Sequence, residues 1–479
     1  NARNKNAYRI LKTKMKVLEQ IISFVNHFYF DQIDFDKVMD GSFRGLMEEL
    51  DPHSTYIPAK EQENISELFK GNFQGIGIEF DILDGYITVI SPIPDSPSEI
   101  VGLMPGDKII SIDKEDAYKI TKSEVFKKLR GTKGSEVLVT ISRIGEPEPF
   151  DVSIIRDNIP IYSVGSATML NENTGYIFLR RFSATTKDEV TSAIDTLLSQ
   201  GMERLLFDLR GNSGGYLEQA AAISDLFINT NDTLVYTIGK IKESNQVFLG
   251  NNSKNNTSDF SLIILINRGS ASAAEIVSGA VQDLDRGLVV GETSFGKGLV
   301  QEQIPLDNGG LIRLTVSRYY TPSGRCIQKP YTDDHDDYFS EMYLRKTSQK
   351  SDSLQKFTTL DGRVVFGGGG ITPDHIVQSK TDSLPTSLVY LYTSDFFNNL
   401  AFDYVDNYRS KMSSLQSIEF KMSDFEKTTM LLKINNWITS ELSNSNITLL
   451  NDEFDNYQSH IIDRVSALII RQYWGWEDM

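Results

Sequence analysis

The sequence of 479 residues predicts an α/β fold for its central part, a small β-rich domain inserted before it, and helical segments at both ends. Three patterns support this fold class. Strand-like apolar runs alternate with amphipathic helices over residues 158–374, and short strands with Gly and Pro turns fill residues 71–157. Helical patterns dominate residues 1–70 and 375–479. We therefore expect four segments with these boundaries.

The N-terminal segment, residues 1–70, has apolar residues at intervals of three and four, as in the stretch 11–22. Its helices are expected to stop at Asp51-Pro52, because proline disfavours the helical conformation of the residue before it. A segment of this size is too small for a core of its own. The C-terminal segment, residues 375–479, is rich in aromatic residues and is predicted to serve packing or dimerisation.

The second segment contains the shortest expected elements. Ile76, Ile78 and Phe80 fall on one face of a strand expected over residues 74–80. A helix ends at Gly131, a residue type suited to helix C-termini. The expected positions are 122–129 for the helix and 86–90, 137–141 and 150–155 for further strands.

The third segment alternates strands and helices, which indicates layered strand–helix units. A buried-type strand over residues 204–209 leads into a glycine loop at 211–215 and a helix over 216–227. The same strand–loop–helix order recurs over residues 262–284. The other expected features are a strand at 174–179, a helix at 188–198, a hairpin of strands 301–306 and 311–320, a surface excursion at 331–353 and a turn at 367–374.

Charge and composition exclude several classes of protein. The formal net charge of −17 argues against a nucleic-acid or anionic-membrane partner, both of which need basic patches. Cys326 is the single cysteine, so no intrachain disulfide can form. No apolar run approaches the ~20 residues of a membrane helix. Because the first residue is Asn1 rather than Met, we expect that a signal peptide or another N-terminal segment has been removed.

Ser272 follows the second strand and stands at the start of an amphipathic helix that carries Ile276, Val277 and Ala280 on one face. Backbone N–H groups at a helix N-terminus lack partners, and the helix dipole is positive there. A serine at this place loses its proton more easily, and neighbouring N–H groups can hold an oxyanion. The alternative is that Ser270 and Ser272 only cap the helix.

A serine nucleophile needs a base, and none of the five histidines stands at a strand end of the α/β segments. Lys297 is the better candidate, because it lies between Gly296 and Gly298 with apolar neighbours beyond them. Burial would lower the pKa of its ammonium toward the ~7–8 that a base requires. If a strand begins at Lys297, then Gln301 shares its face and can orient the amine. The alternative is a solvated surface lysine.

Two glycine-rich stretches invite other interpretations. Residues 291–297 have the spacing of a P-loop, but Gly298 replaces the Ser or Thr that holds magnesium, and a strand pattern follows instead of a helix. Gly214 and Gly215 leave backbone N–H groups that can point at a developing oxyanion. Phosphate binding is the rival interpretation of this pair, but no further phosphate-binding feature accompanies it.

The glycine loop 75–78, the stretch 102–107 and the helix ending at Gly131 occur in an order that resembles a PDZ domain of the bacterial protease type. The resemblance implies that an extended peptide adds as a strand while loop N–H groups bind its terminal carboxylate. The residues implied are Gly75, Ile76, Gly77 and Ile78 at the carboxylate, with Val125 and Leu129 as walls of the side-chain pocket. The alternative for Val125 and Leu129 is plain core.

The whole set of motifs, over roughly residues 45–375, resembles the carboxyl-terminal processing (tail-specific) proteases, which are PDZ-containing serine proteases with a Ser–Lys pair. The motifs are 50–56, 208–215, 269–276, 291–301, 319–325 and 367–374. The resemblance implies Ser272 as nucleophile, Lys297 as general base and Gln301 as its partner. It implies oxyanion donors at Ala273 and at either Gly214 or Gly215. It also implies a core with ClpP/crotonase-like layers.

The resulting hypothesis is a serine endopeptidase that cleaves proteins near free, apolar C-termini held by the PDZ domain. The mechanism requires no metal, nucleotide or other cofactor. The expected location is the periplasm or cell envelope of a Gram-negative bacterium, with a homodimer formed through the helical termini. The alternative is a non-catalytic peptide- or ligand-binding scaffold of the same fold.

Overall fold

The computed structural model describes residues 2–83, 85–143, 145–228, 230–251, 259–331, 338–339, 354–377, 396–442 and 451–474. The chain divides into two compact units. One contains Asn1–Glu63, Val300–Val316 and Tyr331–Ser340, and the other contains Asn64–Leu299, Ser317–Pro330 and Glu341–Met479. Most of the excursion expected at 331–353 lies outside the described residues.

The smaller unit contains α1 (Ala2–Phe28), α2 (Phe35–Glu48) and β1 (Thr55–Ile57). Asp34 caps the start of α2, because its carboxylate accepts the N–H of Lys37. It ends at Glu48, three residues before the expected stop at Asp51. The expectation that residues 1–70 are all helical is wrong at β1, which pairs antiparallel with β18 (Leu311–Tyr320). That partner strand is too distant in sequence for a local pattern to reveal the pairing.

The predicted hairpin is confirmed. Strands β17 (Leu299–Pro305) and β18 pair around the turn 307–310. Gly309 has a φ of 78°, a left-handed conformation that glycine adopts without steric cost. In the larger unit, the end of β18 pairs with β13 (Thr233–Gly239), which also pairs with β14 (Val247–Leu249).

An antiparallel sheet of short strands forms the inserted domain, in the order β3-β4-β5-β7-β8 with β6 beside β5. The expected single strand at 74–80 is wrong, because two strands stand there, separated at Ile76 and Gly77. The domain's elements are β2 (Asn72–Gly75), β3 (Ile78–Leu83), β4 (Tyr86–Pro92), α4 (Pro97–Ile100), β5 (Lys108–Ile112), β6 (Glu115–Asp116), α5 (Lys122–Leu129), β7 (Glu136–Ser142), β8 (Phe150–Ile155) and β9 (Asp157–Pro160), which pairs with β2.

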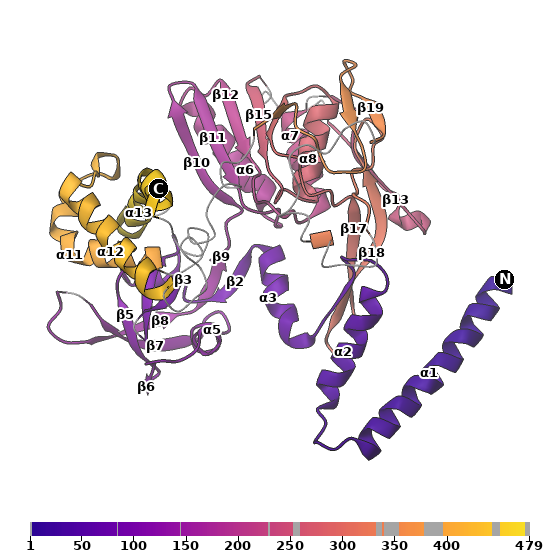
Figure 1. Cartoon of the computed structure of the whole chain (residues 1–479), viewed down its shortest axis with the longest axis horizontal. Coiled ribbons are helices and arrows are strands. Elements are labelled where there is room, and N and C mark those ends of the chain that lie inside the picture. The colour runs from indigo at the N-terminus through magenta and orange to yellow at the C-terminus, as the bar shows by residue number, and fades with distance from the viewer. Residues whose placement is uncertain are drawn as a thin grey trace. The chain divides into compact units, whose positions relative to one another are not determined.

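A six-stranded sheet forms the α/β core in the order β10-β11-β12-β15-β16-β21, and Figure 1 shows β10, β11, β12 and β15 side by side. All neighbouring strands are parallel except β10 against β11. The carboxyl ends of parallel strands meet at one edge, where α/β proteins place their ligands. The strands are β10 (Val164–Asn171), β11 (Thr174–Leu179), β12 (Arg204–Asp208), β15 (Ser261–Ile266), β16 (Leu288–Gly291) and β21 (His375–Ile376).

Helices complete both the core and the C-terminal segment. In the core, α7 (Leu217–Phe227) packs on α8 (Ala273–Asp283), and α6 (Thr186–Ser199) packs on α7 and β10. Helix α3 (Ala59–Lys70) precedes the inserted domain, and β19 (Lys356–Thr358) pairs with β20 (Val364–Phe366).

The expected helical tail is confirmed. Helices α11 (Phe396–Met412), α12 (Asp424–Leu442) and α13 (Asn451–Trp474) surround their own hydrophobic cluster. Within the part of the chain that the structure describes, no helix has the length and apolar character needed to span a bilayer.

Candidate active site

Three loops meet at the carboxyl ends of neighbouring strands β12, β15 and β16. They are residues 209–215, 267–272 and 292–298. The N–H of Ala271 donates to the carbonyl of Asn212 at 2.9 Å, and the N–H of Phe295 donates to the carbonyl of Ser270 at 2.9 Å. Backbone hydrogen bonds therefore hold all three loops together, and the glycine loop, the serine turn and the lysine loop share one edge of the sheet.

Ser272 immediately precedes α8, with φ 55° and ψ −114°. A non-glycine residue rarely adopts such a positive φ, and holding it there costs on the order of 1–3 kcal/mol. Strained strand-to-helix turns of this kind present nucleophilic serines in other hydrolases. Ser272 is half-buried, so its side chain is accessible at the sheet edge.

Ser270 has a different role. Its buried hydroxyl donates to the carbonyl of Leu209 at 2.7 Å and accepts the N–H of Asn267 at 2.9 Å. The Ser270 hydroxyl thus holds the turn in place both as a donor and as an acceptor. Of the two serines considered as caps, Ser270 is the structural one.

Gly214 lies directly against the Ser272 turn. A Cβ atom on Gly214 would be 2.8 Å from the Cβ of Ser272 and 3.0 Å from the N of Ala273, so no other residue fits without a shift. The N–H of Gly214 donates to the side-chain oxygen of Asn212 at 2.9 Å. A Cβ on Gly215 would be 1.9 Å from the carbonyl oxygen of Phe182.

Ala273 is the first residue of α8, so its N–H has no acceptor within the helix. The next residue, Ala274, already donates to the carbonyl of Ala271 at 3.1 Å. The Ala273 N–H, next to Ser272 in the chain, is therefore not used by the helix. Its role as an oxyanion donor stays a prediction.

A carboxylate that the sequence analysis did not single out joins the serine turn to the lysine loop. Glu275 is fully buried and accepts four hydrogen bonds. One oxygen accepts the N–H groups of Ser272 (2.8 Å) and Lys297 (2.9 Å). The other accepts the N–H of Gly296 (2.7 Å) and the hydroxyl of Ser294 (2.5 Å).

Burial raises the pKa of the Glu275 carboxyl, and its four hydrogen bonds act in the opposite direction. A sequence signal for this residue did exist. Ser272 and Glu275 have the S-x-x-E spacing of a capping box, in which the glutamate accepts the N–H of the residue before the helix.

Lys297 is half-buried and precedes β17, which begins at Leu299. The condition under which Gln301 would share a strand face with Lys297, a strand beginning at Lys297, is therefore not met. Gly296 before it has a φ of 92°, which turns the chain toward Glu275. Nearby, the ammonium of buried Lys329 lies 4.4 Å from the ring centroid of Phe295.

Gln301 lies on β17 in the smaller unit, whereas Ser272 and Lys297 belong to the larger one. Its side-chain amide donates to the carbonyl of His53, and the His53 ring is 2.9 Å from the hydroxyl of Tyr338. A role of Gln301 toward Lys297 stays a prediction.

The proposed carboxylate loop of the inserted domain is tightly held. Gly75, Ile76 and Gly77 are buried, Ile78 is half-buried, and a Cβ on Gly77 would be 2.2 Å from the Cβ of Ser96. Val125 and Leu129 belong to the hydrophobic core of this domain, which is the alternative that the sequence left open. A contribution of these six residues to peptide binding stays a prediction.

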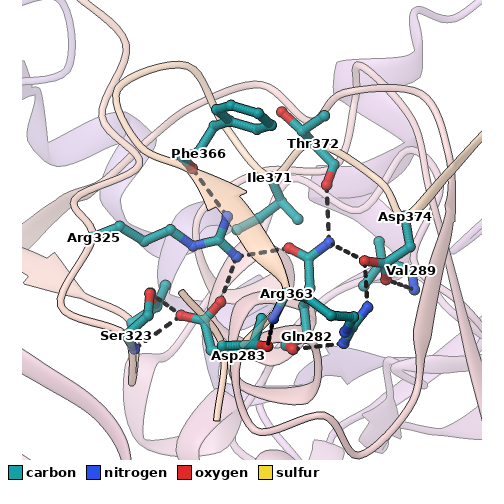
Figure 2. Close-up of polar contacts among 12 residues, drawn as sticks. Gln282, Asp283, Val289, Ser323, Arg325, Arg363, Phe366, Ile371, Thr372 and Asp374 are labelled. Carbon is teal, nitrogen blue, oxygen red and sulfur yellow. Dashed lines mark hydrogen bonds and ion pairs between the residues drawn. The ribbon is translucent and has the colours of Figure 1, made fainter. Parts of the chain in front are cut away.

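The opposite end of α8 is held by a buried polar network, shown in Figure 2. Arg325 donates to Asp283 (2.7 Å) and to Gln282 (2.7 Å), and both side chains of the Arg325–Asp283 ion pair are 0% exposed. Gln282 in turn donates to Asp374 and to the carbonyl of Thr372, each at 3.0 Å. The motifs 319–325 and 367–374 therefore fix the helix that presents Ser272.

One expectation about the histidines needs correction. His375 lies on β21, an edge strand of the core sheet that the sequence did not predict, and it pairs with Val290. It is exposed. The loops 209–215, 267–272 and 292–298 at the carboxyl ends of the core strands contain no histidine.

Comparisons with known proteins agree with these observations. Residues 173–336 match peptidase family S41, and residues 74–154 match the PDZ domain family. The chain is 37% identical over 299 residues to a carboxy-terminal-processing protease of Bartonella bacilliformis, covering 62% of this chain and 68% of the relative.

The chain belongs to the family of carboxy-terminal-processing proteases. The resemblance stated from the motifs is confirmed, as are the S41 peptidase fold and the PDZ domain. The chain is also 36% identical to the carboxy-terminal processing protease CtpA of Bacillus subtilis, and the match covers 66% of each of the two chains.

Among solved structures, the photosystem II D1 C-terminal processing protease aligns with a TM-score of 0.37 and 23% identity. The alignment covers 76% of this chain and 87% of that one. The chain spans about two thirds of the length of these two relatives.

Proposed function

We propose that the protein is a serine endopeptidase that cleaves other proteins near their C-termini, with Ser272 as nucleophile and Lys297 as general base. One observation carries the proposal. The strained Ser272 turn and the Lys297 loop are bound to the same buried carboxylate, at the edge of the sheet where the glycine loop 209–215 also lies. Family membership supports the same assignment.

In this mechanism, the neutral amine of Lys297 removes the proton from the Ser272 hydroxyl as the serine oxygen attacks the scissile carbonyl. The negative charge that develops on the carbonyl oxygen is stabilised by backbone N–H groups. Lys297 then donates its proton to the leaving amine, and a water molecule hydrolyses the acyl-enzyme by the same steps in reverse. Gln301 is proposed to orient the lysine amine.

We assign one oxyanion donor to Ala273, because its N–H is unused by α8. For the second donor, the hydrogen bonds favour Gly215 over Gly214. The Gly214 N–H already donates to Asn212. In the bridge between Gly215 and Phe182, the hydrogen bonds are made by the carbonyl of Gly214 and the N–H of Tyr216. In a parallel bridge of this kind the N–H of Gly215 itself points away from the Phe182 strand.

Substrate selection is proposed to reside in the PDZ domain, where loop 75–78 binds the carboxylate of a free, apolar C-terminal tail. This domain would hold the tail while the scissile bond reaches Ser272. We also propose ClpP/crotonase-like layers for the core and the four-segment division at residues 70, 157 and 374. An exported location, with a signal peptide removed, is proposed from the resemblance, and the periplasm of a Gram-negative cell is one such location.

A homodimer through the helical termini is proposed from the exposure of α1. Apolar side chains such as Leu11, Met15, Ile21 and Phe24 are exposed along this helix. Unpaired apolar stripes of this kind mark contact surfaces. The molar mass in solution, measured with and without residues 1–34, tests this proposal.

The proposed activity is tested with Ser272→Ala and a matched control, Ser278→Ala. Ser278 lies on the same helix, is fully buried, and donates to the carbonyl of Ala274 at 2.7 Å. We expect S272A to lose cleavage of an unfolded reporter protein with an apolar tail, and S278A to retain it within about twofold of wild type. Intact S272A that still cleaves the reporter would refute the assignment.

A further inference from the structure

We infer that Glu275 is a positioning residue that sets the geometry of the Ser272–Lys297 pair by binding both of their backbone N–H groups. The inference rests on the proposed function and deepens it. It assigns a role to a side chain that touches neither substrate nor the reacting atoms.

The hydrogen bonds of Glu275 reach three positions on the lysine loop and one on the serine turn. Ser272 lies three residues before Glu275, whereas Ser294, Gly296 and Lys297 lie 19, 21 and 22 residues after it. One rigid group therefore fixes the separation of two loops that the chain itself connects only through α8 and β16. A shift of either loop would break at least one of these bonds.

Burial makes this arrangement difficult to replace. Glu275 is fully buried, so water cannot substitute for a lost acceptor, and each N–H group that loses it would stay unsatisfied in the interior. The carboxylate also helps to hold Ser272 at its strained φ of 55°, because it fixes the N–H of that residue. Tyr319 fixes the other side, since its hydroxyl donates to the carbonyl of Ser272 at 3.2 Å.

Ser294 extends the same network to the motif at 367–374. Its hydroxyl donates to Glu275 and accepts the N–H of Ile371 at 2.6 Å, and its own N–H donates to the carbonyl of Ile371 at 3.1 Å. The residues after Ile371 then join the polar network at the far end of α8 (Figure 2). Glu275 thus connects the site to the segment that braces the whole helix.

The decisive substitution is Glu275→Gln, which keeps the size of the side chain. Either orientation of the new amide places an NH2 group against at least one N–H donor, because each oxygen of Glu275 faces backbone N–H groups. The loops must then separate. Since misplacement of about 1 Å can cost 10²-fold in rate, we expect kcat to fall at least about tenfold. KM should stay within about twofold, because tail capture belongs to the PDZ domain.

Glu426→Gln is the matched control. Glu426 is also a buried carboxylate with several donors, from Ser423 and Lys411, but it belongs to the C-terminal helical cluster. We expect E426Q to lose stability without change in kcat. A fluorophosphonate probe that labels the serine should react with E275Q at least about tenfold more slowly than with E426Q. Glu275→Asp, which keeps the charge, should give an intermediate rate.

A measurement on the wild-type protein protects this test against a variant that does not fold. In the wild-type protein, the amides of Ser272, Gly296 and Lys297 should exchange slowly with solvent deuterium, and fast exchange at these positions would overturn the inference. So would an E275Q protein with kcat within twofold of wild type. If S272A abolishes cleavage while E275Q is fully active, the positioning role fails and the proposed function stands. If S272A is active, the proposed function itself fails.

Discussion

Ser272 shows at the scale of one residue how the fold stores strain at its site. Its φ of 55° and ψ of −114° are unfavourable for any residue with a Cβ atom. The conformation persists because both flanking peptide groups are bound, the N–H by Glu275 and the carbonyl by Tyr319. Strain of this kind is found where a side chain must be presented for chemistry.

The strain predicts that Ser272→Gly stabilises the protein relative to Ser272→Ala. Both variants remove the hydroxyl and should be inactive, but only glycine adopts a positive φ without steric cost. We expect S272G to be more stable than S272A by about 1 kcal/mol, after the entropic cost of glycine in the unfolded chain is included. Denaturant unfolding of the two variants gives the difference. Equal midpoints would show that the turn is not strained.

Helix α8 is the element on which the candidate site depends. Ser272 stands at its N-cap position, its first turn carries Ala273 and Glu275, and its last turn ends in Gln282 and Asp283. Each end is bound to segments that lie far away in sequence. An 11-residue helix that is buried along its length can therefore hold the proposed nucleophile in one place. The neighbouring loops carry the proposed base and the second proposed oxyanion donor.

The buried ion pair at the end of α8 predicts a large cost for Asp283→Asn. Arg325 and Asp283 are both 0% exposed, so the substitution leaves a buried guanidinium without a charged partner. We expect a loss of about 3–5 kcal/mol in the free energy of unfolding. Asp285→Asn is the control, because its partner Arg363 is 35% exposed and the pair should contribute about 1 kcal/mol or less. Similar losses for both variants would contradict this reasoning.

The whole molecule combines parts with separate hydrophobic cores. The PDZ domain has one such cluster, and helices α11, α12 and α13 have another. The protein's three tryptophans, Trp437, Trp474 and Trp476, all belong to the C-terminal segment. Tryptophan fluorescence therefore follows the unfolding of this segment and not that of the α/β core.

Acid should unfold the C-terminal segment through Glu426. Burial alone would raise the pKa of this carboxyl, but the hydrogen bond from Lys411 and those from Ser423 outweigh it and lower the pKa to about 2. Because the folded-state pKa lies below the ordinary glutamate pKa of 4.5, the stabilisation is complete above pH 4.5 and is lost as the pH falls toward 2.

At neutral pH this contribution is at most about 3 kcal/mol. E426Q should therefore be less stable than wild type at pH 7, and the difference should nearly vanish at pH 2. Tryptophan emission recorded during urea unfolding at several pH values measures it. A difference that stays constant from pH 7 to pH 2 would show that Glu426 does not carry this dependence.

Local patterns predicted much of the fold. Periodicity and turn residues predicted the two strand–loop–helix units at 204–227 and 262–284, the PDZ helix at 122–129 and the hairpin of strands 301–306 and 311–320. Strand β1 was missed because its three residues pair with a strand near Ile312. The sequence left open whether a strand begins at Lys297. The strand begins at Leu299, and the Glu275 carboxylate holds the N–H of Lys297 in the loop before it.

The sequence by itself determined the family, the order of the segments and the residue types at the candidate site, because these follow from spacing along the chain. Only the tertiary structure decided how the residues divide their roles. It showed that Ser270 holds the turn, that the Gly214 N–H is used by Asn212, and that Glu275 binds both the serine turn and the lysine loop. The physical reason is that one buried acceptor collects donors up to 22 residues away, and such pairing leaves almost no trace in a local pattern.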